Sequence, residues 1–155
     1  MQEEDMQQEE EPRLEIITPD TSTQADVPLA ASGGSAGVSA GFPSPAEDFL
    51  EPSIDLNRTL IRNAASTFFV RVSGDSMKDD RIDDGDLLVV DKSLEPSDGC
   101  VAVCFLDGEF TLKRVRMGRD RLTLMPANPR YRPIEVSRDN HFAIWGVVTY
   151  AIKKI

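Results

Sequence analysis

The sequence predicts a mostly β fold, and three observations support that prediction. Between residues 67 and 151, short runs of β-branched and aromatic residues are separated by Gly, Pro, Asp and Asn. No helical pattern alternates with these runs, which argues against a parallel βαβ architecture. The chain has 155 residues and is 40% hydrophobic, which is enough for a single ordinary core. We therefore expect one small β-rich domain.

Residues 1–40 precede this domain and differ from it in composition. They hold nine carboxylates against Arg13 alone, and they end in a run of Ala, Ser and Gly. Such a segment buries too little apolar area to offset the entropy of ordering it, so we expect a flexible, disordered acidic arm. Only Leu14–Ile17 has the apolar character of a strand that could dock. The domain, residues 41–155, begins at Gly41–Pro45, whose prolines favour an extended chain.

The elements of the domain follow in order along the chain. Ser53 is a candidate N-cap for a short helix. The imperfect apolar stripe of this helix would consist of Ile54, Leu56, Leu60 and Ile61. Seven strands are predicted after it, over residues 67–72, 86–90, 100–106, 109–115, 121–124, 134–136 and 141–151.

The Asp107-Gly108 step predicts a hairpin with a defined register. A two-residue turn at this step pairs Lys113 with Ala102 on the opposite strand. Alternation along the strands places Lys113 on a face of small residues that also holds Cys104 and Thr111. Because small neighbours leave room for a second layer of chain, Lys113 is a candidate for removal from water.

The net charge of the chain is −10, and most of it lies in the arm: −8 within residues 1–40 and −2 within residues 41–155. A phosphate backbone repels so acidic a segment, so direct DNA binding is not expected. No apolar run approaches the ~20 residues that a membrane span requires, and the acidic N-terminus is unlike a secretion signal. We expect a cytoplasmic protein without a membrane anchor.

Cys100 and Cys104 lie four residues apart in one predicted strand. A disulfide between them would distort the backbone there, so we expect two reduced thiols. Together with the single histidine, His141, they do not form a convincing zinc site. No metal or cofactor is expected.

Ser76 and Lys113 are candidates for a nucleophile and its base. Ser76 lies in Ser73–Met77, whose glycine permits a tight turn that presents the hydroxyl and neighbouring backbone N–H groups. A buried lysine amine can activate a serine where no histidine serves. A lysine in water has a pKa of ~10.4 and is almost entirely protonated at neutral pH, so the hypothesis requires a buried Lys113. The alternative is an ordinary turn serine and a Lys113 paired with Glu109 or Asp107 on an exposed hairpin.

A candidate substrate lies in the same chain. The Ala40–Gly41 bond has small side chains on both sides, so its backbone can enter a narrow cleft, and it precedes Ser76 by 36 residues (76 − 40). This length allows attack within one molecule or on a partner copy, so cis and trans cleavage both remain open. Small residues are common in flexible segments, so the bond alone does not indicate a cleavage site.

Several motifs occur in a fixed order along the chain. They are Ala40–Pro45, Ser73–Met77, Asp84–Asp91, Asp107–Arg114, Pro126–Ile134 and Trp145–Val148. With this order and spacing, the chain from about Gly41 to Ile155 resembles the LexA/UmuD family of self-cleaving serine peptidases. The resemblance implies the β-rich C-terminal peptidase fold of that family. It also implies that Ser76 is the nucleophile, Lys113 the general base and Ala40–Gly41 the scissile bond.

The N-terminal segment distinguishes between branches of the family. A repressor would need a basic helix-turn-helix domain there, whereas residues 1–40 are acidic and rich in Gly and Ser. The chain therefore resembles the UmuD type of SOS mutagenesis protein. That type implies homodimers and self-cleavage stimulated by a RecA filament on single-stranded DNA. It also implies a product, residues 41–155, that acts as accessory subunit of a UmuC-type Y-family DNA polymerase in error-prone translesion synthesis. Residues 1–13 extend beyond such an arm and have no assigned role.

Two alternatives come from other functional classes. The chain could be a non-catalytic dimerisation and docking module with a disordered partner-binding tail, and Lys113 would then be exposed. It could also be a protease of other proteins, similar to signal peptidases with their Ser/Lys dyad. Those enzymes need a membrane anchor, which the sequence does not indicate.

Overall fold

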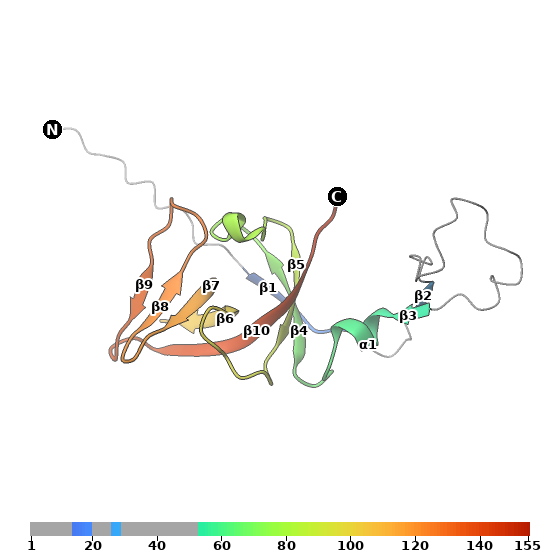
Figure 1. Ribbon diagram of the computed structural model, residues 1–155, viewed down its shortest axis with the longest axis horizontal. Helices are drawn as coiled ribbons and strands as arrows, with labels where there is room; N and C mark the ends of the chain where they lie inside the picture. Colours follow the sequence, from blue (N-terminus) through green and yellow to red (C-terminus); the bar gives the residue numbers. More distant parts are fainter. Residues whose placement is uncertain (1–13, 20–25, 29–52) are drawn as a thin grey trace, which may run out of the picture. The chain divides into compact units, whose positions relative to one another are not determined.

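The computed structural model describes residues 14–19, 26–28 and 53–155, which belong to two compact units (Figure 1). Residues 14–19 and 65–155 lie in the first unit, and residues 26–28 and 53–64 lie in the second. The first unit therefore contains both Ser76 and Lys113. The Ala40–Gly41 bond lies outside the described residues.

The first unit is an eight-stranded antiparallel sheet with the order β1-β4-β5-β10-β6-β7-β8-β9. The strands are β1 (Leu14–Ile17), β4 (Thr67–Val72), β5 (Leu87–Asp91), β6 (Val101–Leu106), β7 (Glu109–Met117), β8 (Leu122–Met125), β9 (Ile134–Val136) and β10 (Phe142–Ile152). The mostly β prediction is confirmed. All seven predicted strands are present, with bounds that differ from the prediction by at most two residues.

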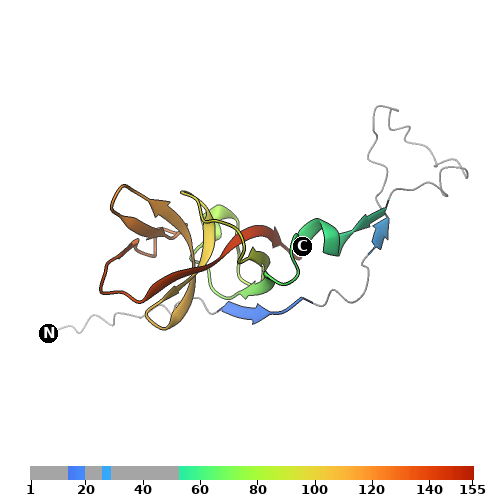
Figure 2. The same cartoon turned by 90° about the horizontal axis from the view of Figure 1, so that it is seen from below.

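Strand β10 joins the two halves of the sheet, and Figure 2 shows it running through the unit. Its first half pairs with β6 and its second half with β5, and the register shifts between Ile144 and Gly146 and again between Val148 and Tyr150. Such bulges increase the local twist, which curls the sheet around its core. Gly146 is required at the first bulge, because a Cβ there would lie 2.5 Å from Cγ1 of Val90.

Two hydrophobic clusters lie on opposite faces of the β6–β7 hairpin. Val103 and Leu112 belong to the first cluster, which also includes residues of β4 and β5. Ala102 and Val115 belong to the second cluster, which β8 and β9 cover. The predicted division of the hairpin into two faces is therefore confirmed. The layer of chain expected over the small-residue face is the β8–β9 pair.

The turn of this hairpin is also as predicted. Asp107 and Gly108 have φ values of 47° and 91°, and two successive positive values are typical of a type I′ turn. The turn sets the register, in which Leu106 pairs with Glu109 and Ala102 with Lys113. The position of Lys113 thus follows from two residues at the tip of the hairpin.

The described residues of the second unit form a short strand pair and one helix. Strand β2 (Asp26–Pro28) pairs antiparallel with β3 (Ser53–Asp55), and α1 (Leu56–Leu60) follows directly. The prediction that Ser53 caps the helix is wrong. Asp55 is the N-cap, and its carboxylate accepts hydrogen bonds from the next backbone N–H groups. Pairing with β2 keeps Ser53 extended, so the next residue of a good capping type takes that role.

The expectation of a disordered arm over residues 1–40 falls mostly outside the described residues, as does the boundary at residue 41. Within the arm, Leu14–Ile17 docks on β4 as expected. The pairing of Asp26–Pro28 with β3 was not predicted, because nothing in its composition distinguishes it from the surrounding segment.

Candidate active site

Ser76 lies in a tight turn that follows β4 and precedes a short 3₁₀ helix, Lys78–Asp80. Gly74 has a φ of 103°, in the region that favours glycine, and its N–H donates to Oδ1 of Asp84 at 2.8 Å. The residue Ser76 is only 3% exposed. The expected tight turn is therefore present, and it holds the serine at the edge of the core.

Hydrogen bonds to the segment after β8 orient the peptide groups of this turn. The carbonyl of Asp75 accepts from Nδ2 of Asn128 at 2.9 Å, and the carbonyl of Ser76 accepts from the N–H of Ala127 at 2.8 Å. The C=O and N–H of a trans peptide unit point in opposite directions. The N–H groups of Ser76 and Met77 therefore point away from this segment, on the same side of the turn.

The side chain of Asp75 also binds this segment. The hydroxyl of Tyr131 donates to Oδ1 of Asp75 at 2.8 Å, across 56 residues of sequence. Asp75 thus forms a hydrogen bond well beyond its own turn. Asn128 and Tyr131 were not among the predicted site residues, although both lie in the Pro126–Ile134 motif. That motif was the available signal, and its role here is to hold the serine turn.

Lys113 lies in the middle of β7 and is 1% exposed. Its Nζ donates to Oγ1 of Thr111, two residues earlier on the same face of the strand, at 2.7 Å. The alternative of an exposed hairpin lysine is therefore wrong. Thr111 was expected only as a small neighbour, whereas the structure makes it a polar partner of the amine.

Cys104 is a neighbour of Lys113 on this face. Burial, and to a smaller extent the nearby Cys100, raise the pKa of the Cys104 thiol from 9.0 to about 12, against an opposing effect of Lys113. Both cysteines are free, as predicted. Because the Cys104 thiol stays protonated at neutral pH, it supplies no negative charge that would hold Lys113 in the ammonium form.

The structure brings the Ser76 turn and the Lys113 strand together through their neighbours. Arg114 donates from Nε and Nη2 to Oδ2 of Asp80 at 3.0 and 2.9 Å, which joins β7 to the short helix after Ser76. Met77 and Leu112, which adjoin the two candidate residues in sequence, pack in the same hydrophobic cluster. The residues on either side of Lys113 thus contact the segment that carries Ser76, with side chains on the face of β7 opposite that of Lys113.

His141 lies at a different place in the sheet. It is exposed, and its backbone N–H and C=O bind Asp107 in the hairpin turn at 2.9 and 2.8 Å. Lys113 lies four residues beyond Glu109, the first residue of β7, and is therefore about 13 Å along the strand from the end next to the turn. The histidine is therefore remote from the buried lysine, which agrees with the choice of lysine as the candidate base.

Within the described parts of the chain, no three His, Cys, Asp or Glu side chains gather into a group that could hold a metal ion. No helix among the described residues is long and apolar enough to cross a membrane.

Comparison with known proteins bears directly on this arrangement. Residues 34–149 match the family described as Peptidase S24-like. The chain belongs to this family. Its S24 region includes the serine turn, the β6–β7 hairpin and the segment after β8 that binds the turn.

Individual proteins similar to this S24 chain are known from enteric bacteria. Protein SamA of Salmonella typhimurium strain LT2 is 47% identical over 115 residues, which are 74% of this chain and 79% of SamA. Protein MucA of Escherichia coli is 45% identical over 116 residues, with coverage of 74% and 79%. Protein ImpA of Shigella flexneri is 43% identical over 117 residues, with coverage of 74% and 78%.

These findings confirm the family, the fold and the class of activity that the motifs predicted. The protein is a UmuD-like member of the S24 family, a self-cleaving serine peptidase of SOS mutagenesis.

Proposed function

We propose that this peptidase cleaves its own Ala40–Gly41 bond with Ser76 as nucleophile and Lys113 as general base. The observation that carries the proposal is the burial of Lys113, which is 1% exposed beside an uncharged thiol and a hydroxyl. Removal from water disfavours an ammonium ion and favours the neutral amine. A neutral amine that donates one N–H to Thr111 keeps its lone pair for the proton of a serine.

The reaction proceeds in two steps, acylation of Ser76 and hydrolysis of the resulting ester. Nζ of Lys113 takes the proton of the Ser76 hydroxyl while Oγ attacks the Ala40 carbonyl carbon. The Ala40–Gly41 bond then breaks, and the lysine returns that proton to the departing nitrogen of Gly41. Water attacks the Ala40 ester on Ser76, with its proton passing through Lys113 to Oγ, and releases the arm with a terminal carboxylate at Ala40.

The turn supplies the donors that the tetrahedral intermediate needs. The N–H groups of Ser76 and Met77 share one side of the turn, because the carbonyls of Asp75 and Ser76 are held by the opposite segment. Two such N–H groups form a pocket that stabilises a developing oxyanion. We assign them this role.

The chain is long enough for cleavage within one molecule. Strand β1 ends at Ile17, which pairs with Phe69 on β4. The 23 residues from Ile17 to Ala40 (40 − 17) can span up to roughly 75 Å when extended, whereas the seven residues from Phe69 to Ser76 (76 − 69) span at most about 25 Å. Cis cleavage is therefore compatible with a docked β1, and trans cleavage within a homodimer is equally open.

The biological setting follows from the UmuD-like assignment. Cleavage divides the chain into an arm, residues 1–40, and a product, residues 41–155. A RecA filament on single-stranded DNA stimulates the cleavage, and the homodimeric product serves a UmuC-type Y-family DNA polymerase in the cytoplasm. The net charge of −10 argues against direct contact of the chain itself with DNA.

The dyad is tested by incubation at about pH 10, where more lysine is neutral, with mass spectrometry of the products. Wild type is expected to lose residues 1–40, whereas Ser76→Ala and Lys113→Ala stay intact. Ser73→Ala, in the same turn, and Lys92→Ala are the matched controls and are expected to cleave like wild type. Cleavage of Ser76→Ala or Lys113→Ala at the wild-type rate, or a break at another bond, contradicts the proposal.

The RecA step is tested at neutral pH with the same variants. Addition of RecA, single-stranded DNA and a nucleotide that keeps the filament active is expected to accelerate cleavage of wild type but not of Ser76→Ala. Equal rates with and without the filament would contradict a role for RecA. The non-catalytic docking module has no supporting observation here, since it required an exposed Lys113.

A further inference from the structure

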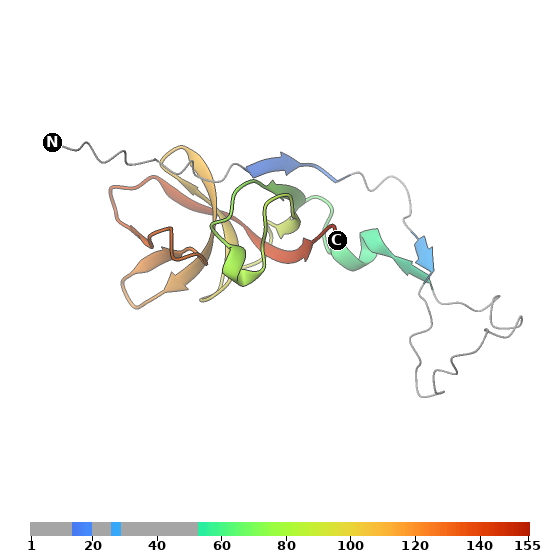
Figure 3. The same ribbon diagram turned by 90° about the horizontal axis from the view of Figure 1, so that it is seen from above.

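Strand β1 is the terminal strand of the sheet, and it comes from the segment that cleavage is proposed to remove. It pairs antiparallel with β4 from Leu14 opposite Val72 to Ile17 opposite Phe69. Figure 3 shows it lying along β4 at the margin of the sheet. Without β1, strand β4 would be the edge.

The hydrogen bonds of β4 define which of its backbone groups face β1. The N–H of Val72 donates to the Asp86 carbonyl, and the Val72 carbonyl accepts from Gly85, so both main-chain groups of Val72 face the β5 side. In an antiparallel sheet successive residues turn these groups to alternate sides. The N–H and C=O groups of Phe69 and Arg71 therefore face β1 and would be unpaired at the edge after its loss.

Side chains of β1 add two kinds of contact to this pairing. Leu14 packs against the first hydrophobic cluster and lines a surface cavity of ≈ 350 Å³ together with Glu15, Arg71 and Ser73. Arg71 Nε and Glu15 Oε2 lie 4.0 Å apart, with both side chains well exposed. An exposed ion pair of this kind stabilises by less than about 1 kcal/mol.

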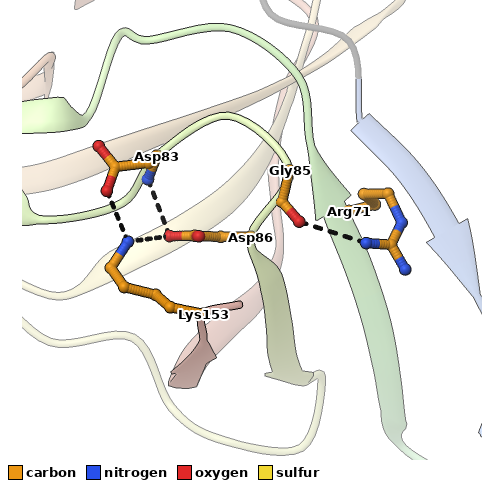
Figure 4. Close-up of polar contacts among 5 residues, drawn as sticks. All are labelled: Arg71, Asp83, Gly85, Asp86 and Lys153. Carbon is orange, nitrogen blue, oxygen red and sulfur yellow. Dashed lines mark hydrogen bonds and ion pairs between the residues drawn. The ribbon is translucent and has the colours of Figure 1, made fainter. Parts of the chain in front are cut away.

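The loop between β4 and β5 is held by contacts that do not involve the arm. Figure 4 shows Lys153 between the carboxylates of Asp83 and Asp86, and Arg71 donating to the Gly85 carbonyl at 3.2 Å. Hydrogen bonds from Lys153 to Asp83 and then Asp86 raise the pKa of the Lys153 amine, so the bridge stays charged. These contacts hold the loop that follows β4 independently of β1.

We propose that β1 is an autoinhibitory occupant of the β4 edge, and that cleavage opens this edge as a strand-addition site for an extended segment of a partner protein. The inference rests on the proposed cleavage at Ala40–Gly41 for its trigger. The β1–β4 pairing itself does not depend on that cleavage.

The physical basis is the change from intramolecular to intermolecular pairing. A tether holds a docking segment at an effective concentration on the order of 1 mM, whereas a severed arm at ~10 μM protein is about 100-fold more dilute. Among the described residues of the arm, the contacts are this four-residue strand with the packed Leu14, one exposed ion pair and the three-residue pairing of β2 with β3, which we expect not to compensate for that dilution. The severed arm therefore leaves, although no contact in the folded domain has changed.

The chemistry of β1 defines the partner that fits. An added strand satisfies the free main-chain groups of Phe69 and Arg71 whatever its sequence. Specificity comes from side chains: apolar residues at the positions of Leu14 and Ile16, opposite Val72 and Val70, and an acidic residue between them opposite Arg71. The partner is thus an extended segment with the pattern apolar, acidic, apolar.

Amide hydrogen exchange measures the occupancy of this edge. We compare the intact Ser76→Ala chain with the product of wild-type cleavage under the same conditions. The amides of Phe69 and Arg71 are expected to lose protection by about tenfold or more on cleavage, while those of Val70 and Val72, bonded to the β5 side, keep theirs. Equal protection of Phe69 and Arg71 in both forms overturns the inference.

A second comparison does not depend on cleavage. In the Ser76→Ala background, Ile17→Pro removes an N–H that faces β4, whereas Ile16→Pro removes one that faces solvent and serves as the matched control. Only Ile17→Pro is expected to expose the amides of Phe69 and Arg71. The amides of Leu88 and Val90 report that the rest of the sheet is intact. Equal effects of the two prolines contradict the assignment.

A synthetic peptide of residues 11–19 tests strand addition directly. Added in excess to the Ile17→Pro chain, it is expected to restore protection at Phe69 and Arg71, and a Glu15→Lys version is expected to bind several-fold more weakly. Absence of rebinding at millimolar peptide overturns the site. If wild type does not cleave but the proline pair behaves as stated, the cleavage proposal fails and the edge site stands without its trigger.

Discussion

Two neighbours of Lys113, Thr111 and Cys104, carry no charge at neutral pH. The Thr111 hydroxyl accepts from Nζ, and the Cys104 thiol is kept protonated by burial. A general base needs a neutral amine whose lone pair points at its substrate. Neither of these two neighbours carries a charge that would hold the amine as an ammonium ion, and the bond to Thr111 fixes the direction of one N–H. Both features favour catalysis.

The Thr111 hydroxyl is therefore expected to act as a positioning group. Thr111→Val keeps the shape of the side chain but removes the acceptor, which frees the amine to rotate, and the rate of self-cleavage at alkaline pH is expected to fall about tenfold. Thr111→Ser restores an acceptor and should recover most of the rate. Electrophoresis of timed samples measures both. A Thr111→Val chain that cleaves at the wild-type rate would show that the hydroxyl has no such role.

Burial of Cys104 predicts a pH dependence of stability. The folded thiol has a pKa of about 12 against 9.0 when unfolded, so only the unfolded state loses the proton between these values. The contribution of this thiol to the free energy of unfolding is therefore complete below pH 9. It declines above pH 9 by up to about 1.4 kcal/mol per pH unit. Urea denaturation of Ser76→Ala chains from pH 8 to pH 11 measures the effect. The free energy of unfolding should fall more steeply with Cys104 present than in Cys104→Ala, whereas Cys100→Ala should keep the steep dependence.

Among the elements, the β6–β7 hairpin has the strongest local determinants. A two-residue turn with positive φ at Asp107 and Gly108 sets the register, and the register places Lys113 opposite Ala102. No comparable local signal sets the start of α1, because Ser53 and Asp55 are equally good capping types. Pairing of β3 with β2 decides between them, and that pairing joins residues separated by more than 20 positions.

Strand β10 requires a glycine where it changes partners. In Gly146→Ala the new Cβ would lie 2.5 Å from Cγ1 of Val90 in the adjacent strand, so we expect a loss of about 1–3 kcal/mol in the free energy of unfolding. Gly118→Ala is the matched control, because its Cβ would meet nothing closer than 3.6 Å. Urea denaturation of both variants measures the difference. Equal stability of the two would contradict the close packing of β10 against β5.

On the scale of the whole molecule, the arm carries most of the charge. The intact chain has a net charge of −10, of which −8 belongs to residues 1–40 and −2 to residues 41–155. If the severed arm leaves the domain, the product should elute from an anion-exchange column at clearly lower salt than the intact Ser76→Ala chain. Co-elution of arm and domain at the position of the intact chain would show that the arm stays bound after cleavage.

Sequence patterns were sufficient to predict the β-rich fold, the hairpin register, the family and the candidate dyad, because these follow from periodicity, turn chemistry and ordered motifs that are local in the chain. Three features appear first in the folded chain: Tyr131 and Asn128 hold the Ser76 turn, Thr111 binds the lysine, and β1 occupies the β4 edge. The Tyr131 bond to Asp75 spans 56 residues, and the β1–β4 pairing is similarly distant. Such contacts depend on how the sheet curls, and no local pattern in the chain encodes that geometry.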